Sequence, residues 1–327
     1  MTSNYITKVA IIGAGGNSGS YMVKSLLETG KHTVTAITRQ DSTTKLPEGV
    51  AVARVDYGRP ETIVEALRGQ DALIVTLGVS ASKDTDRMLV QAAADAGVPW
   101  IMPNEWGPDN EDEGARRDIP GFAPKKDIRE LIKSTGKSSY LSVSCGFWYE
   151  WSIAIPPSWG FDFANKTVTF VDDGETKIST STWPQVGRAV AAILSLPIKA
   201  APGDGDAKAS LESLRDTCIY VNSFTVSQRD MLDSVLRVTG DDEAAWTITR
   251  EPAEERFARA REEMVGGSRE GFVKAMYTRV FFQDGVGNFE KARGVANGLL
   301  GLPREDIDVA TAAGIERAKK PLWADAH

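Results

Sequence analysis

A short apolar run that ends in a cluster of glycines, close to the start of the chain, constrains the fold more than any other feature. Residues 9–12 (Val-Ala-Ile-Ile) are apolar and mostly β-branched, which is typical of a buried parallel strand. After the glycines, apolar residues recur at helical spacing until Gly30, a residue suited to end a helix. Strand, glycine turn and helix form the context in which glycine spacing indicates a nucleotide site.

The glycine spacing fits two patterns. G-x-G-x-x-G would use Gly13 and Gly15 but has Ser18 in its last position, whereas G-x-x-G-x-x-G is complete with Gly13, Gly16 and Gly19. Glycine permits a tight turn and lets backbone N–H groups approach a diphosphate at the positive end of a helix. The alternative is a glycine-rich turn that binds nothing. We predict that the turn binds a dinucleotide through Gly13, Gly15, Gly16, Asn17, Ser18 and Gly19.

Composition narrows the class of protein. With 327 residues, the chain can hold a nucleotide domain and a smaller partner domain. A net charge of -7 without a basic block argues against direct nucleic-acid binding. We find no leader pattern and no apolar run long enough to span a bilayer, so we expect a cytoplasmic location and no membrane partner. We expect a monomer or a homodimer. Cys145 and Cys218 lack metal or redox spacing.

Histidine is scarce, and this limits the chemistry. The chain has only His32, at the start of an expected strand, and His327, its last residue. A Ser-His-Asp triad, a zinc site or a histidine general base is therefore not expected, and no metal site is predicted. Proton transfer would have to use Lys, Tyr, Asp or Glu.

Alternating strand and helix patterns predict the architecture. After the first strand, strands are expected at 32–38, 50–55, 72–76, 99–103 and 139–144, with helices between them. This alternation predicts an α/β fold with a doubly wound parallel sheet of the Rossmann type, which binds ligands beyond the carboxyl ends of its strands. We place an NADP-binding domain at 1–150, joined by a return strand near 217–221, and a smaller, interleaved α/β substrate-binding domain at 151–327. In the latter we expect a hairpin of 167–171 with 176–180, and a loop at 200–210.

Arg39 bears on the choice of cofactor. An NAD-specific site usually carries an acidic residue about 20 positions after the glycines, where it binds the ribose 2′-hydroxyl. Arg39 occupies that place here, and an arginine can pair with the 2′-phosphate of NADPH or NADP⁺. A solvated surface arginine is the alternative. Thr76 and Gly78 at the end of the fourth strand, and Asn104 after the fifth, are expected to border the diphosphate and the nicotinamide ribose.

Lys125 is the candidate for proton transfer. It lies near the start of a helix opened by Pro124, and at helical spacing it falls about 20° from the apolar Ile132, whereas Lys126 points to solvent. Burial and the neighbouring charges of Lys126 and Arg129 would lower the pKa of such a lysine toward neutrality. A structural lysine whose stem covers apolar surface is the alternative.

Aromatic residues cluster after two of the expected strands. Trp106 follows the fifth strand, and Phe147, Trp148 and Tyr149 follow the sixth. Such a cluster at a carboxyl-end loop suggests a pocket for a flat, aromatic substrate. The same residues could instead pack the smaller domain onto the sheet.

The combined pattern resembles the NmrA-like, isoflavone-reductase-like branch of the atypical short-chain dehydrogenase/reductases. The resemblance runs from residue 8 to about 240 and implies that Lys125 is the catalytic general acid/base and helps to hold the nicotinamide ribose. Plant members have Ser at the position of Asn104, and the aromatic run looks more like that of fungal members. The residues that carry the resemblance are Gly13/Gly16/Gly19, Arg39, Asn104-Glu105-Trp106-Gly107, Phe122-x-x-Lys125-x-x-Ile128-Arg129 and Gly146-Phe147-Trp148.

The resemblance implies an NADPH-dependent reductase that acts on a small aromatic or conjugated molecule of secondary metabolism. Two other classes stay open. One is a non-catalytic dinucleotide sensor that contacts a transcription factor, as NmrA does, and the other is an NADP-binding isomerase or cyclase without net redox. Retention of Lys125 favours the enzyme, because a sensor has no need of a buried cation there.

Overall fold

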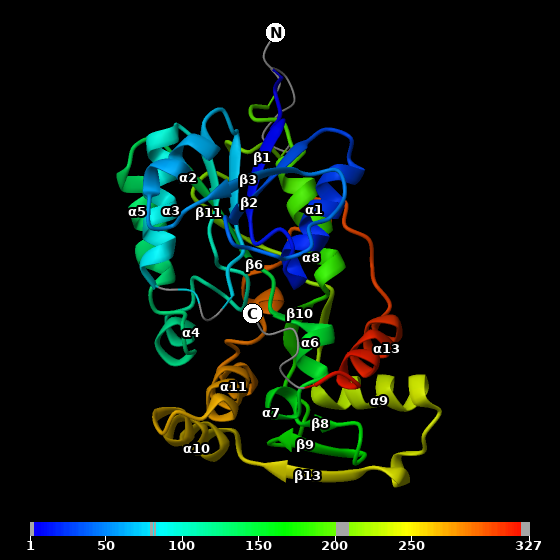
Figure 1. The fold of residues 1–327 in the computed structure, drawn as a ribbon. Coiled ribbons are helices and arrows are strands. Elements are labelled where there is room, and N and C mark those ends of the chain that lie inside the picture. The colour runs from blue at the N-terminus through cyan, green and yellow to red at the C-terminus, as the bar shows by residue number, and fades with distance from the viewer. Residues whose placement is uncertain (1–2, 79–80, 82, 201–208, 322–327) are drawn as a thin grey trace.

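A seven-stranded sheet organises the upper half of the molecule in Figure 1. The computed structural model describes residues 3–78, 81, 83–200 and 209–321. All seven strands run parallel, in the order β11-β6-β5-β4-β1-β2-β3, which confirms the doubly wound sheet and the return strand. Their bounds are β1 Lys8–Ile12, β2 Thr33–Arg39, β3 Ala51–Val55, β4 Ala72–Val75, β5 Trp100–Met102, β6 Ser139–Ser144 and β11 Thr217–Tyr220.

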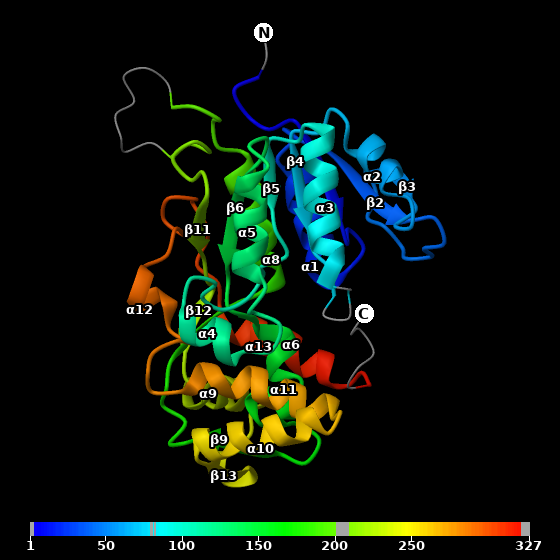
Figure 2. The same ribbon diagram turned by 90° about the vertical axis from the view of Figure 1, so that its left-hand side faces the viewer.

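Helices cover both faces of this sheet, as Figures 1 and 2 show. Alternate residues of β1 point to opposite faces, so that Ile11 joins one apolar layer and Ile12 the other. Gly187 brings one pair of helices together, because a Cβ there would lie 2.5 Å from the carbonyl oxygen of Tyr21. One face carries α1 (Asn17–Glu28) and α8 (Trp183–Leu194); the other carries α2 (Pro60–Leu67), α3 (Lys83–Ala96) and α5 (Lys125–Ser134).

A second domain lies below the sheet and has its own apolar core. It contains two three-stranded sheets, β12-β10-β7 and β13-β9-β8. Their strands are β7 Phe147–Trp148, β8 Phe161–Asp162, β9 Thr167–Val171, β10 Ile178–Ser181, β12 Phe224–Val226 and β13 Thr247–Glu251. The helices are α4 Glu113–Asp118, α6 Tyr149–Ile153, α7 Pro156–Trp159, α9 Gln228–Thr239, η1 Glu243–Ala245, α10 Ala253–Val265, α11 Arg269–Thr278, η2 Arg279–Phe281, α12 Phe289–Arg293 and α13 Ile307–Ala318.

The predicted hairpin is wrong. Both strands exist, as β9 and β10, but they belong to different sheets: β9 pairs with β8 and β13, whereas β10 pairs with β7 and β12. Between them Asp172 and Gly174 adopt positive φ angles, so the chain does turn there. A turn sequence determines only the local change of direction, and pairing follows the neighbours that bury each strand best.

The two domains interleave along the chain. After β6 the chain enters the lower domain, returns to the sheet for α8 and β11, and then leaves it again. The boundary placed at residue 150 stays a prediction, and most of the loop expected at 200–210 lies outside the described residues. Within the described ranges, no helix has the length and apolar character needed to cross a membrane.

Candidate active site

The glycine turn joins β1 to α1 at the carboxyl edge of the sheet. Gly13 has a φ of 85°, and a Cβ on it would lie 2.0 Å from the carbonyl oxygen of Thr76. A Cβ on Gly19 would lie 2.1 Å from the carbonyl oxygen of Gly13. Gly16 is the N-cap of α1, and it provides no side chain to occupy the helix end. Gly13 and Gly19, the first and last glycines of the complete G-x-x-G-x-x-G spacing, are therefore positions where close backbone contact excludes a side chain.

The loop after β2 lies against this turn. A Cβ on Gly15 would be 2.5 Å from Cγ2 of Thr44 and 2.7 Å from the carbonyl oxygen of Lys45. Arg39 is the last residue of β2, and its side chain is 70% exposed beside Asp41, with Nε 3.7 Å from Oδ1. An exposed ion pair of this length contributes little, so the guanidinium can turn toward a ligand at little cost.

Two residues of the loop after β5 hold the end of β4. Asn104 accepts a hydrogen bond from the N–H of Leu77 at 3.2 Å and donates to the carbonyl oxygen of the same residue at 3.3 Å. The indole of Trp106 donates to the carbonyl oxygen of Val75 at 2.8 Å. Thr76 is buried, and its N–H donates to Ile12. Asn104 and Trp106 thus position the segment that ends in the exposed Gly78.

Lys125 is the first residue of α5, and its side chain is half-buried, whereas Lys126 is exposed. Its Nζ lies 3.6 Å from the centre of the Phe122 ring and donates a long hydrogen bond of 3.5 Å to Oδ1 of Asn110. Burial of the ammonium group lowers the pKa of Lys125 to about 8, against the opposing effect of Glu105. A lysine ammonium group with such a lowered pKa can donate a proton near neutral pH.

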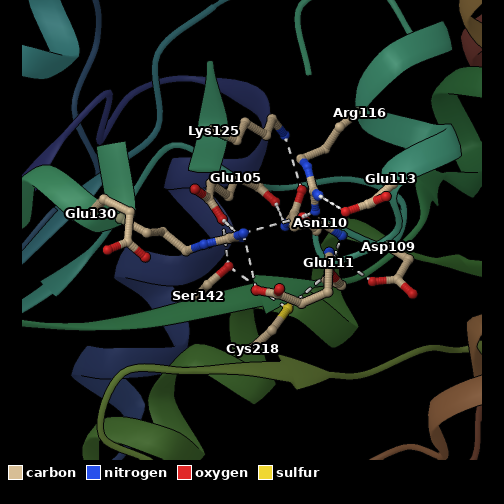
Figure 3. A network of polar contacts seen from close by, with 12 residues as sticks. Glu105, Asp109, Asn110, Glu111, Glu113, Arg116, Lys125, Glu130, Ser142 and Cys218 are labelled. Carbon is tan, nitrogen blue, oxygen red and sulfur yellow. Dashed lines mark hydrogen bonds and ion pairs between the residues drawn. The ribbon is translucent and has the colours of Figure 1, made fainter. Parts of the chain in front are cut away.

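A buried polar network, which Figure 3 shows, supports Lys125. Oε2 of Glu105 accepts hydrogen bonds from Arg129 at 2.8 Å and from Ser142 at 2.6 Å. Asn110 is fully buried; its side chain donates to the carbonyl oxygen of Glu105 at 2.7 Å, and its N–H donates to Ser144 at 3.1 Å. These contacts fix Oδ1 of Asn110 as the acceptor that faces Lys125.

Glu105 and Asn110 are functional candidates that the sequence patterns did not reveal. A signal was present for Glu105, because it lies two positions after the buried strand expected at 99–103, and a carboxylate buried there would need a partner. Asn110 had no comparable signal, because the sequence does not show which partners surround it.

The aromatic residues divide into two groups. Tyr149 is fully buried and its hydroxyl bonds to Thr311 at 2.8 Å, so it belongs to the core of the lower domain and cannot touch a substrate in this arrangement. Phe147 is also buried and packs on Tyr277 with ring centres 4.1 Å apart. Trp106 and Trp148 are half-buried against the sheet core and keep exposed surface.

A cavity of about 820 Å³ lies beside the start of α1, between α8 and α13. Its lining includes Asn17, the first residue of α1, together with Trp183 and Glu150. Burial raises the pKa of Glu150 to about 7. This cavity adjoins the glycine turn on the α1 side, whereas Lys125 lies on α5 at the other face of the sheet.

Of the two histidines, the structure describes His32. His32 is buried, and its ring nitrogens bond to Ile6 and Ser195. His327 lies outside the described residues. Within the described ranges no three His, Cys, Asp or Glu side chains gather in a group able to hold a metal ion.

Comparison with known proteins shows that the chain is similar to oxidoreductases. Residues 6–154 match the NmrA-like family. The oxidoreductase aprR of Aspergillus flavus is 28% identical over 94% of this chain and 98% of its own length. The fold is similar to that of an isoflavone reductase, with a TM-score of 0.70 at 20% identity over 94% of this chain and 98% of the other. An NADPH-dependent quinone oxidoreductase from Escherichia coli, solved with NADPH, has a TM-score of 0.66 at 17% identity over 93% and 98%.

Proposed function

We propose that the chain is an NADPH-dependent reductase of a small aromatic or conjugated molecule, because residues 6–154 match the NmrA-like family and the oxidoreductase aprR is similar to the chain over almost its whole length. The observation that carries the proposal is the place of Lys125. Its Nζ lies beside Gly107, which bridges to Ser144 at the carboxyl end of β6, the same edge of the sheet that bears the glycine turn. A substrate held between Lys125 and the glycine turn could accept a hydride from the cofactor and a proton from Lys125.

The residues at this edge fit a dinucleotide. Gly13 and Gly19 leave no space for a side chain. Gly16 precedes α1 as its N-cap, so the helix has no side-chain cap, and its first turn has no acidic residue. The positive end of α1 is therefore suited to a diphosphate, and Arg39 to a 2′-phosphate. NADPH, when bound, would supply a hydride to the substrate.

Lys125 would then act as the proton donor. With a pKa of about 8, Nζ is mostly protonated at neutral pH, and its hydrogen bond to Asn110 keeps the ammonium group oriented. After donation, Nζ would regain a proton from solvent, because the side chain is only half-buried. Trp106 and Trp148, which keep exposed surface, are the candidates for contact with a flat substrate.

The test is a titration of tryptophan fluorescence with NADPH, NADP⁺, NADH and NAD⁺. We expect Arg39→Ala to weaken NADPH binding roughly 10- to 100-fold, the effect of losing charge-assisted hydrogen bonds. NADH binding should not change. Arg68→Ala is the matched control, because Arg68 is equally exposed but follows α2 and pairs with Glu65.

Turnover separates the enzyme from the alternatives. In the reductase, NADPH oxidation with quinones and conjugated carbonyl compounds should fall about 100-fold or more in Lys125→Ala, the scale of a lost general acid, and stay unchanged in Lys126→Ala. Binding of oxidised cofactors irrespective of the 2′-phosphate, without turnover, would instead indicate a sensor. If none of the four cofactors binds, both the reductase hypothesis and the sensor hypothesis are wrong.

A further inference from the structure

The aromatic ring of Phe122 lies against the ammonium group of Lys125. The centre of the ring is 3.6 Å from Nζ, well within the distance of about 6 Å at which a ring face attracts a cation. One local structure supplies both residues, because the N–H of Lys125 donates to the carbonyl oxygen of Phe122 at 3.1 Å and α5 begins at Lys125. In such a turn, as on a helix, side chains three positions apart are neighbours.

Packing fixes the ring in this place. Phe122 is 6% exposed and belongs, with Ile119, to the apolar core of the lower domain. The loop after β5 makes room for the ring, since a Cβ on Gly107 would lie 2.6 Å from Cζ of Phe122. Ile128, which follows Lys125 on α5, belongs instead to an apolar layer of the sheet. Lys125 therefore lies where the two domains meet, and the lower domain holds the ring beneath its amine.

Lys125 has charged neighbours, but the ring is closer than any of their charges that the structure shows in contact. The other groups that act on Lys125 from the elements around it are Glu105, the Cys145 thiol, Arg129, Asp86 and the Asn110 amide. No carboxylate of the described residues forms an ion pair with Nζ, and its polar contact is the 3.5 Å hydrogen bond to Asn110 in Figure 3. The ring face is thus the group in direct contact that favours the positive charge.

We propose that Phe122 is a positioning residue for Lys125: the face of its ring stabilises the ammonium form and fixes Nζ in the place from which it donates a proton. This inference rests on the proposed role of Lys125 in the reductase. Burial alone favours the neutral amine, which cannot protonate a developing oxyanion. A ring face opposes that loss of charge and, unlike a carboxylate, cannot take the proton itself, so the proton stays available to a substrate.

The sign of the effect follows from the attraction between ring and cation. Because the ring favours the charged form, replacing it with an aliphatic side chain of similar size should lower the pKa of Lys125. The loss of such a contact away from water corresponds to about one unit, which takes the pKa from about 8 to about 7. At pH 7 the neutral amine would then be about fivefold more abundant.

Pulse acetylation with acetic anhydride measures this pKa, because only the neutral amine reacts. Acetylation of Lys125 would be quantified by mass spectrometry between pH 5.5 and 10, with the exposed Lys126 as internal standard. The pH of half-maximal reaction reports the pKa, whereas a change in access to the reagent alters only the plateau. In Phe122→Leu this midpoint should fall by about one unit, and Phe122→Tyr, which keeps the ring, should keep the wild-type midpoint.

A fluorinated ring separates the charge of the ring face from the shape of the side chain. A trifluorinated phenylalanine at position 122 nearly keeps the volume of the ring but removes most of the negative charge from its face. The midpoint of Lys125 should therefore fall as in Phe122→Leu. Phe161→Leu is the matched control, because Phe161 is fully buried in the same core but lies in β8, and it should leave the midpoint unchanged.

The outcomes distinguish this inference from the proposed function. A wild-type midpoint in folded Phe122→Leu or with the fluorinated ring would overturn the inference, and so would an equal fall in Phe161→Leu. If Phe122→Leu does not fold, the fluorinated ring decides: a lowered midpoint supports the inference, and an unchanged one refutes it. Full reductase turnover in Lys125→Ala would contradict the proposed function, whatever the acetylation shows.

Discussion

Gly19→Ala isolates the steric requirement of the nucleotide turn. Gly19 lies in the first turn of α1, where alanine is ordinarily favoured over glycine by about 1 kcal/mol. Its Cβ would nevertheless stand 2.1 Å from the carbonyl oxygen of Gly13, whereas ordinary contact begins at 3.4 Å. The turn and the helix would have to separate by more than 1 Å. We expect this cost to exceed the gain in helix propensity.

The magnitude follows from the two opposing effects. Overpacking of a tight contact costs about 1–3 kcal/mol, and here the obstacle is backbone that cannot rotate aside. We therefore expect a net loss of about 1–2 kcal/mol in the free energy of unfolding. Because the displaced groups are those that would approach the diphosphate, NADPH affinity should fall at least about 100-fold, the scale expected when a site is misplaced by about 1 Å.

Urea unfolding and NADPH titration on the same preparations test the prediction, and Gly16→Ala is the matched control. A Cβ on Gly16 would lie 3.2 Å from the carbonyl oxygen of Gly13, which a small shift relieves. Gly16→Ala should therefore lose NADPH affinity through its approach to the ligand while keeping wild-type stability. If Gly19→Ala is as stable as wild type and binds NADPH equally well, the steric argument for the turn is wrong.

Two further predictions concern buried carboxyl groups. Burial raises the folded-state pKa of Glu150 from 4.5 to about 7, so the free energy of unfolding should fall as pH rises across that interval. In thermal unfolding, Glu150→Gln should therefore be more stable than wild type by up to about 3 kcal/mol at pH 8 and equally stable below pH 5. Equal gains in stability at both pH values would contradict this. Glu105→Ala should cost about 3–5 kcal/mol in urea unfolding, because it removes the buried carboxylate partner of the Arg129 guanidinium and leaves the half-exposed Glu111 and the carbonyl oxygen of Asn110; a cost under about 1 kcal/mol would refute that reasoning.

Local patterns in the sequence predicted which segments of the sheet domain form strands and which form helices. The strand at 9–12 and the alternation that follows predicted the doubly wound sheet, because strand and helix periodicities are properties of neighbouring residues. The isolated run at 217–221 was predicted to return to the sheet, and β11 does so beside β6. The glycines also act locally, since Gly13 and Gly19 meet within a single strand–turn–helix unit.

Pairing in the lower domain depended on contacts that no local pattern records. The turn near Gly174 is present, but β9 and β10 find partners that lie far away in the sequence. Tyr149 shows the same limit: its place beside Trp148 suggested a pocket wall, yet its hydroxyl meets Thr311, more than 160 residues later. An aromatic residue in the core and one in a pocket wall cannot be distinguished from their neighbours in the sequence alone.

The surroundings of Lys125 mark the boundary between the two kinds of information. Helical spacing was enough to direct Lys125 toward the protein and Lys126 toward solvent, since both lie on one helix. Only the tertiary structure brings Oδ1 of Asn110 and the charge of Glu105, both from the segment after β5, close enough to act on that amine. The charge state of a buried lysine depends on such neighbours in space, because desolvation and Coulomb interactions act over a few ångströms and not along the chain.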